Sequence, residues 1–198
     1  MANSGCTSPI RSAWPVAVLL GLGCGEDALR PDGAARAALP PIDYCDQARD
    51  WPVPWEHTEQ QAIDIVDALR ERGGDCGTEG YLHATPSLRL HGALTCAARA
   101  HAVAMADAAF FGHTAPDEPV LEARIETVDY RGSVIEHLAA GAQDAEHAVD
   151  QVWGSSDQHC ADLLSGDHID VGLGFVGNTV GEQYPTYWVI LLGDPSGS

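Results

Sequence analysis

The sequence predicts an α+β fold in which several helices precede an antiparallel hairpin. Apolar residues recur at helical spacing between residues 58 and 109, and again after residue 120. The pattern changes in the last third, where 168–176 and 186–193 alternate in the manner of strands, with turn residues between them. An apolar fraction of 45% provides enough material for a buried core. The chain of 198 residues therefore fits one α+β domain with extensions.

The N-terminal segment resembles an export signal. Residues 1–23 carry one charged side chain, Arg11, followed by an apolar run that is too short for a comfortable membrane span, so they are expected to be a signal peptide. The run LGLGCG resembles a bacterial lipobox, which makes Cys24 the expected lipidation site. Plain secretion is the alternative, and a cytosolic location is the weakest one. Residues 24–56 are rich in Pro, Ala, Gly and Asp and are expected to form a tether that becomes ordered near Cys45 and Trp51.

Two helices are expected in the first half of the domain. The first is predicted to begin near Thr58, whose side chain forms a capping box with Gln61, and to stop at Gly73. The second covers roughly 90–109 and has a continuous apolar stripe rich in alanine. His101 lies on that stripe, so we expect a buried histidine with a hydrogen-bond partner.

A short helix over 120–130, a strand over 134–141 and a helix capped by Asp144 follow. The strand, VIEHLAAG, is apolar except for Glu136 and His137. Neighbouring residues of a strand point to opposite faces, so one of these two side chains must face whatever the strand covers.

The charge balance excludes some partners. The chain has 29 acidic residues and 10 basic ones, all of them arginine, for a net charge of −19. Such a surface repels nucleic acid and anionic membranes, so membrane contact is expected only through a lipid anchor. A solvated acidic surface explains this charge, and a cation-binding surface is the alternative.

Six cysteines are present, and four of them remain if Cys6 leaves with the signal and Cys24 carries lipid. An even number in an exported protein predicts two disulfides, and four cysteines allow three pairings. None of the cysteines forms a C-x-x-C pair, which argues against a cysteine zinc site.

Three polar residues stand out in apolar or tight surroundings: His113, Glu136 and His159. Two intervals of 23 residues separate them, so only the fold can bring them together. Histidine and glutamate are ligand types for zinc and also serve as general acids and bases. If the fold brings them together, these residues are candidate ligands for Zn²⁺ or another divalent metal, and candidate general acids and bases.

Five motifs, in this order, resemble those of the CAP superfamily, the SCP-like proteins that include cysteine-rich secretory proteins, antigen 5 and pathogenesis-related proteins. They are LTCAARAHAVAMADAAFFGH, VIEHLAAG, WGSSDQHCADLL, VGLGFV and YWVILLG. The resemblance covers about 58–194 and implies a CAP domain over 57–195, of the bacterial type. It implies a three-layer α-β-α sandwich with a small antiparallel sheet and a cleft lined by His113, Glu136 and His159. Glu136 would then face the cleft and His137 the other side.

The chain departs from the family pattern at several cleft positions. Ser156 stands where eukaryotic members often have a second glutamate, and His137 stands where the family has asparagine. Ile135 replaces a glycine, and Asp157-Gln158 replaces Pro-Gly, with Asp157 as a possible replacement carboxylate.

We favour the disulfides Cys76–Cys160 and Cys45–Cys96; a bridge at Cys160 would also fix the cleft wall beside His159. Cys76–Cys96 is the main rival pairing.

The resemblance and the residues together predict an exported, non-enzymatic binding module. Its cleft is expected to take a divalent metal, and a lipid, a protein or a cell-envelope component is the further ligand class expected. The inventory of catalytic groups is thin, because no nucleophile motif surrounds the serines near Trp153. A metal-assisted hydrolase that uses the same cleft is one alternative, and a structural envelope protein is another.

Overall fold

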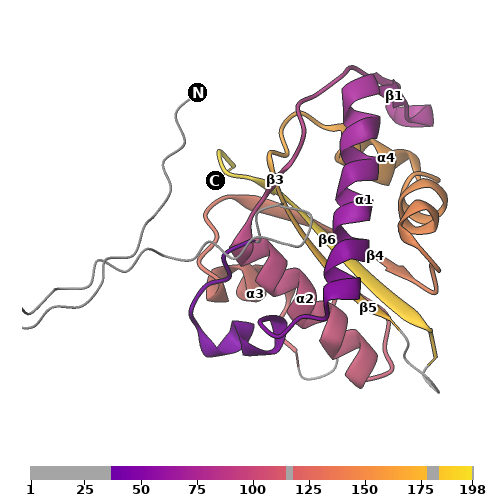
Figure 1. The fold of residues 1–198 in the computed structure, drawn as a ribbon. Helices are drawn as coiled ribbons and strands as arrows, with labels where there is room; N and C mark the ends of the chain where they lie inside the picture. The colour runs from indigo at the N-terminus through magenta and orange to yellow at the C-terminus, as the bar shows by residue number, and fades with distance from the viewer. Residues whose placement is uncertain (1–36, 115–117, 178–182, 198) are drawn as a thin grey trace, which may run out of the picture. The chain divides into compact units, whose positions relative to one another are not determined.

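The structure is a computed structural model that describes residues 37–114, 118–177 and 183–197. The expected signal peptide, Cys24 and most of the turn between the last two strands lie outside these residues. The elements are η1 (Asp43–Ala48), α1 (Val53–Arg72), β1 (Gly74–Asp75), η2 (Gly77–Glu79), β2 (Tyr81–Leu82), β3 (Arg89–Leu90), α2 (Gly92–Asp107), α3 (Leu121–Thr127), β4 (Ser133–Ala140), η3 (His147–Trp153), α4 (Asp157–Leu164), β5 (Asp170–Gly177) and β6 (Thr186–Asp194) (Figure 1).

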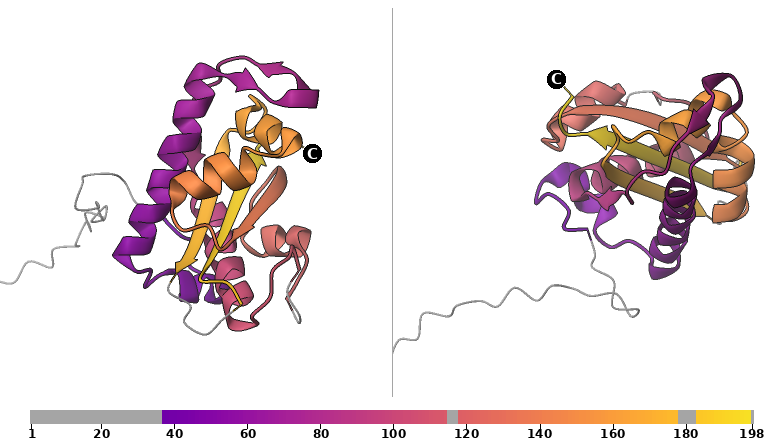
Figure 2. Two further views of the ribbon diagram at one scale, coloured as in Figure 1. Left: turned by 90° about the vertical axis from the view of Figure 1, so that its right-hand side faces the viewer. Right: turned by 90° about the horizontal axis from the view of Figure 1, so that it is seen from above.

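The central sheet has four strands in the order β3-β5-β6-β4. Strands β5 and β6 pair antiparallel, as the alternating patterns predict, and β4 pairs antiparallel with the other side of β6. The two-residue strand β3 adds a parallel pair at the far edge, which the sequence did not indicate. Strand β4 is therefore an edge strand, and it forms one border of the sheet in the right-hand view of Figure 2.

Helices cover both faces of the sheet. One core cluster joins α2, α3 and η1 to the face formed by Val134, Leu138 and their neighbours. A second cluster joins α1, η3 and α4 to the opposite face, which includes Ala139 and Trp188. Alternate residues of each strand enter different clusters, as strand geometry requires. The predicted α+β class with an α-β-α sandwich is confirmed.

Helix α2 packs unusually close to β5. A Cβ atom added to Gly172 would lie 2.1 Å from the Leu94 carbonyl carbon, and one added to Gly174 would lie 2.4 Å from the Ala98 carbonyl oxygen. Alanine on the helix and glycine on the strand allow this approach, because larger side chains would keep the backbones apart. The tight fit fixes the helix that leads to the loop of His113.

Helix α1 begins at Val53, so the predicted start near Thr58 is wrong. Pro54 stands in the first turn, where the missing N–H costs nothing. The Thr58 hydroxyl donates to the Pro54 carbonyl inside the helix and caps nothing. Glu59 of this helix is buried and accepts hydrogen bonds from Trp51 and Arg99.

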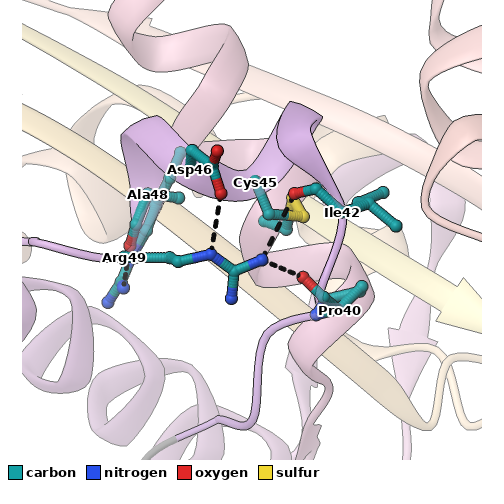
Figure 3. Close-up of a disulfide and its surroundings, with 8 residues drawn as sticks. Pro40, Ile42, Cys45, Asp46, Ala48 and Arg49 are labelled. Carbon is teal, nitrogen blue, oxygen red and sulfur yellow. Dashed lines mark hydrogen bonds and ion pairs between the residues drawn. A yellow bond between two sulfur atoms is a disulfide. The ribbon is translucent and has the colours of Figure 1, made fainter.

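The two expected disulfides form, and the rival Cys76–Cys96 pairing does not. Cys45 bonds to Cys96, and Cys76 bonds to Cys160. The first ties η1 to α2, and Figure 3 shows Arg49 beside it, donating to the Pro40 and Ile42 carbonyls. The second ties the segment after β1 to α4. The bridges thereby join η1 and the segment between β1 and η2 to helices that flank the central sheet.

The Asp144 side chain accepts from the His147 N–H, as predicted for a helix start, although the turns from His147 to Trp153 are π-helical. Helix α4 was not predicted; Ser156 is its N-cap and accepts from the His159 N–H at 3.5 Å. None of the helices in the described residues is long and apolar enough to span a bilayer.

Candidate functional site

His113 lies in the loop after α2. The chain leaves the helix through Ala109, whose φ of 48° is left-handed, and reaches His113 four residues later. The His113 side chain is 68% exposed, and its Nδ1 lies 2.9 Å from Glu136 Oε1. A carboxylate beside Nδ1 favours the tautomer in which that nitrogen donates, so it orients the ring and directs Nε2 away from the carboxylate.

Glu136 is buried on the face of the sheet that α2 and α3 cover. Arg124 of α3 places Nη2 2.9 Å from Glu136 Oε2 and also donates to the His113 carbonyl at 3.0 Å. The guanidinium has no exposed surface, so it compensates the buried carboxylate where water is excluded.

His101 of α2 stabilises the loop that carries His113. It is fully buried; its Nδ1 lies 2.6 Å from Glu118 and its Nε2 lies 3.0 Å from the Gly112 carbonyl. The predicted buried histidine with hydrogen-bond partners is confirmed. By holding the Gly112 carbonyl, it fixes the residue just before His113.

His159 lies on the other side of β4, in the first turn of α4. Its ring packs against His137, with centroids 4.3 Å apart and planes at 53°. His137 Nε2 lies 3.3 Å from an Asp162 carboxylate oxygen. Burial, followed by the nearby His159, lowers the pKa of His137 to about 4, although Asp162 acts in the opposite direction. His137 is therefore neutral at ordinary pH.

A cleft of about 550 Å³ lies at the edge strand β4, and its lining includes residues from both faces of that strand. His113, Glu136 and His159 all line it. His113 and Glu136 are in direct contact, whereas His159 contacts His137. His137 also lines the cleft, although its side chain leaves the opposite face of β4 from Glu136. The expectation that the two side chains face opposite sides of β4 is confirmed, and the cleft reaches both residues.

The arrangement does not fit a three-ligand metal site. The part of the chain that the structure describes contains no group of three His, Cys, Asp or Glu residues placed to hold a metal ion. Glu136 faces a buried guanidinium, whose charge disfavours a cation at the same oxygens. His159 is turned toward His137. Binding a metal between His113 and His159 would require these contacts to change.

Two residues near the cleft, Arg124 and Asp162, were not identified from the sequence. Arg124 stands one residue before the core residue Ile125, so a charged residue on the apolar side of α3 was the available signal. Asp162 follows His159 by one helical turn, a signal that exists only if α4 is recognised. Asp157, considered as a replacement carboxylate, accepts instead from the Thr78 N–H and hydroxyl.

The comparisons with known proteins agree with this architecture. An extracellular protein containing an SCP domain from Bacillus anthracis superimposes with a TM-score of 0.56 and 22% identity, over 70% of this chain and 40% of that one. An outer surface protein of Borrelia burgdorferi gives a TM-score of 0.56 and 18% identity, over 70% of this chain and 93% of that one. At these identities the likeness shows the fold. A search of curated proteins gave no match.

The chain spans less than half of the Bacillus protein, so its match concerns a domain of that larger chain. Residues 63–192 match the sequence profile of the cysteine-rich secretory protein family, CAP. The matched region contains the helix before His113, strands β4 and β5, and most of β6. It covers most of the chain, and the chain therefore belongs to the CAP family.

Proposed function

We propose that this CAP-family protein is an exported binding module whose cleft beside β4 holds a ligand without converting it. The observation that carries the proposal is the state of Glu136. One oxygen is bonded to His113 and the other faces Arg124, so the carboxylate is a fixed polar support for the cleft wall. A volume of about 550 Å³ lies in the range of ligand sites.

The chemistry of the lining favours binding over catalysis. A hydrolase needs a general base or nucleophile within reach of its substrate. Glu136 is engaged on both oxygens, and His137 is held against His159 and Asp162. His113 keeps its Nε2 for a ligand, because its Nδ1 is used by Glu136. The cleft therefore offers one oriented imidazole and apolar walls from residues such as Val120 and Leu121.

Export is supported by the two disulfides, because such bridges persist in oxidising compartments. The outer-surface and extracellular relatives support it as well. Lipidation of Cys24 would anchor the module to the cell envelope, and mass spectrometry of the protein from its native membrane fraction tests this. A lipid, a protein or another envelope component is then the expected ligand class.

The test uses the oxidised full-length chain and three cleft variants, His113→Ala, Glu136→Gln and His159→Ala. The exposed His83, outside the cleft, provides the matched control His83→Ala. Zinc chloride is titrated by calorimetry, and the fluorescent fatty acid cis-parinaric acid is titrated by emission. We expect at least one probe to bind and the cleft variants to weaken it about tenfold, or 1.4 kcal/mol.

Two results would contradict the proposal. If the three cleft variants bind each probe with the same affinity as the unmodified chain, the cleft is not the binding site. Hydrolysis of p-nitrophenyl acetate above the buffer rate, lost in Glu136→Gln and retained in His83→Ala, would establish the hydrolase instead. Zinc binding that requires all three cleft residues would show that their contacts rearrange around a metal.

A further inference from the structure

In the part of the chain that the structure describes, no strand pairs with the outer edge of β4. The Gly141 N–H donates to the Thr186 carbonyl, which fixes the phase of the ladder between β4 and β6. Bonded pairs alternate along an antiparallel ladder, so the N–H and C=O of Val134 and Glu136 point away from β6. Among the described residues, no turn or loop backbone group bonds to either one.

A groove runs along this edge. One hollow, of about 660 Å³, lies between α3 and the start of β4, and it shares Leu121, Glu122 and Val134 with the cleft of about 550 Å³. Together the two hollows are lined by Gly132 and by the residues of β4 from Ser133 to His137. At about 3.4 Å per residue, this stretch has room for roughly five residues in extended conformation.

The groove has walls on both sides of the strand edge. Helix α3 contributes Leu121 and Glu122, and α4 contributes Gln158 and Asp162. A chain laid beside β4 would direct alternate side chains toward these two walls, because strand residues alternate between faces.

The walls are acidic. Glu122, Glu126 and Asp129 line the α3 side, and Asp162 lines the α4 side. Arg131 brings a positive charge, but it is paired with Asp129. Charge complementarity therefore favours a basic partner. A second copy of this chain is disfavoured, because each copy carries a net charge of −19.

We propose that the groove binds a basic, extended segment of a partner protein by adding it as a strand beside β4. The outward groups of Val134 and Glu136 form the backbone hydrogen bonds, and Glu122, Glu126 and Asp162 select arginine or lysine side chains. The inference rests on the proposed function and deepens it, since it names the partner class of the same cleft.

The probe is the peptide Ac-Arg-Val-Arg-Val-Arg-Val-NH₂, titrated into the ¹⁵N-labelled, oxidised full-length chain. We expect a Kd below about 1 mM and at least tenfold slower amide hydrogen exchange at Val134 and Glu136. Ile135 and His137 already bond to β6, so their exchange should not change. The same peptide N-methylated at every residue keeps the charges, lacks backbone donors and should bind at least tenfold more weakly.

Variants of the chain isolate the two parts of the proposal. Val134→Pro removes an outward N–H and leaves the ladder to β6 intact, as proline on an edge strand can. Val134→Ala loses the same side chain and keeps the N–H, so at least tenfold weaker binding by the proline variant reports the backbone bond. The double variant Glu122→Gln/Glu126→Gln should weaken binding and reduce its salt dependence. Glu71→Gln, an exposed acid at the end of α1, is the matched charge control.

Several results would overturn strand addition. They are absence of peptide binding at about 1 mM, equal binding of the N-methylated peptide, and equal binding by the Val134→Pro and Val134→Ala proteins. A dimer by light scattering that Val134→Pro dissociates would assign the edge to a second copy instead. The proposed function fails separately, because zinc or cis-parinaric acid binding that depends on His113 would survive any of these results.

Discussion

Replacing Arg124 with methionine tests whether Glu136 depends on the buried guanidinium. Arg124 has no exposed surface, and its Nη2 lies 2.9 Å from Glu136 Oε2. Removing one member of a buried ion pair costs about 3–5 kcal/mol, because the other charge stays buried. His113 still contacts Glu136 Oε1 at 2.9 Å and compensates part of the loss. We therefore expect the free energy of unfolding to fall by about 3 kcal/mol.

Urea denaturation followed by tryptophan fluorescence measures this change on the oxidised protein. The double variant Arg124→Met/Glu136→Gln also removes the carboxylate charge that Arg124→Met leaves unpaired. It should recover about half of the lost free energy of unfolding. Arg131→Met is the matched control, because that arginine is 87% exposed and its change should leave stability unaltered. A loss below about 1 kcal/mol for Arg124→Met would refute the reasoning, since Glu136 would then be compensated by other groups.

Three further predictions concern the scaffold around the cleft. Replacing Cys76 and Cys160 with alanine should cost about 4 kcal/mol, because their bridge closes a sequence separation of 84, and an unchanged melting temperature would contradict this. Gly174→Ala should cost at least about 2 kcal/mol in urea denaturation, because its Cβ would meet the Ala98 carbonyl. Burial, with smaller effects of neighbouring charges, lowers the pKa of His137 from 6.5 to about 4, so only the unfolded chain takes up this proton as the pH falls. The free energy of unfolding should therefore fall by up to about 3 kcal/mol as the pH falls from 6.5 to about 4, and then level off. The variant His137→Asn should lack this part of the pH dependence.

The sequence predicted the parts of the fold that have strong local patterns. The alternation in β5 and β6 and the alanine stripe of α2 place these elements correctly, because the same residues decide both local conformation and burial. The start of α1 was misplaced, because the capping box at Thr58 competes with a proline start that needs no polar cap. Helix α4 is eight residues long, too short for its periodicity to stand out.

The candidate site was predictable only through resemblance. The contact between His113 and Glu136 joins residues 23 apart in sequence, and no local period encodes it. Arg124 and Asp162 were missed because their roles depend on tertiary neighbours: a buried carboxylate for one and a buried histidine for the other. A charge inside a short apolar helix becomes informative only when the partner on another element is known.

The edge position of β4 explains how Glu136 and His137, which leave opposite faces of the strand, both reach one cleft. In a central strand the sheet would separate them, whereas at an edge the cleft passes round the strand. His113 then joins Glu136 on the α2 side, and His159 joins His137 on the α4 side. A ligand that contacts both histidines of the predicted set must cross the outward backbone of β4. That backbone is the surface proposed for strand addition, so a bound peptide and a ligand that bridges His113 and His159 should compete.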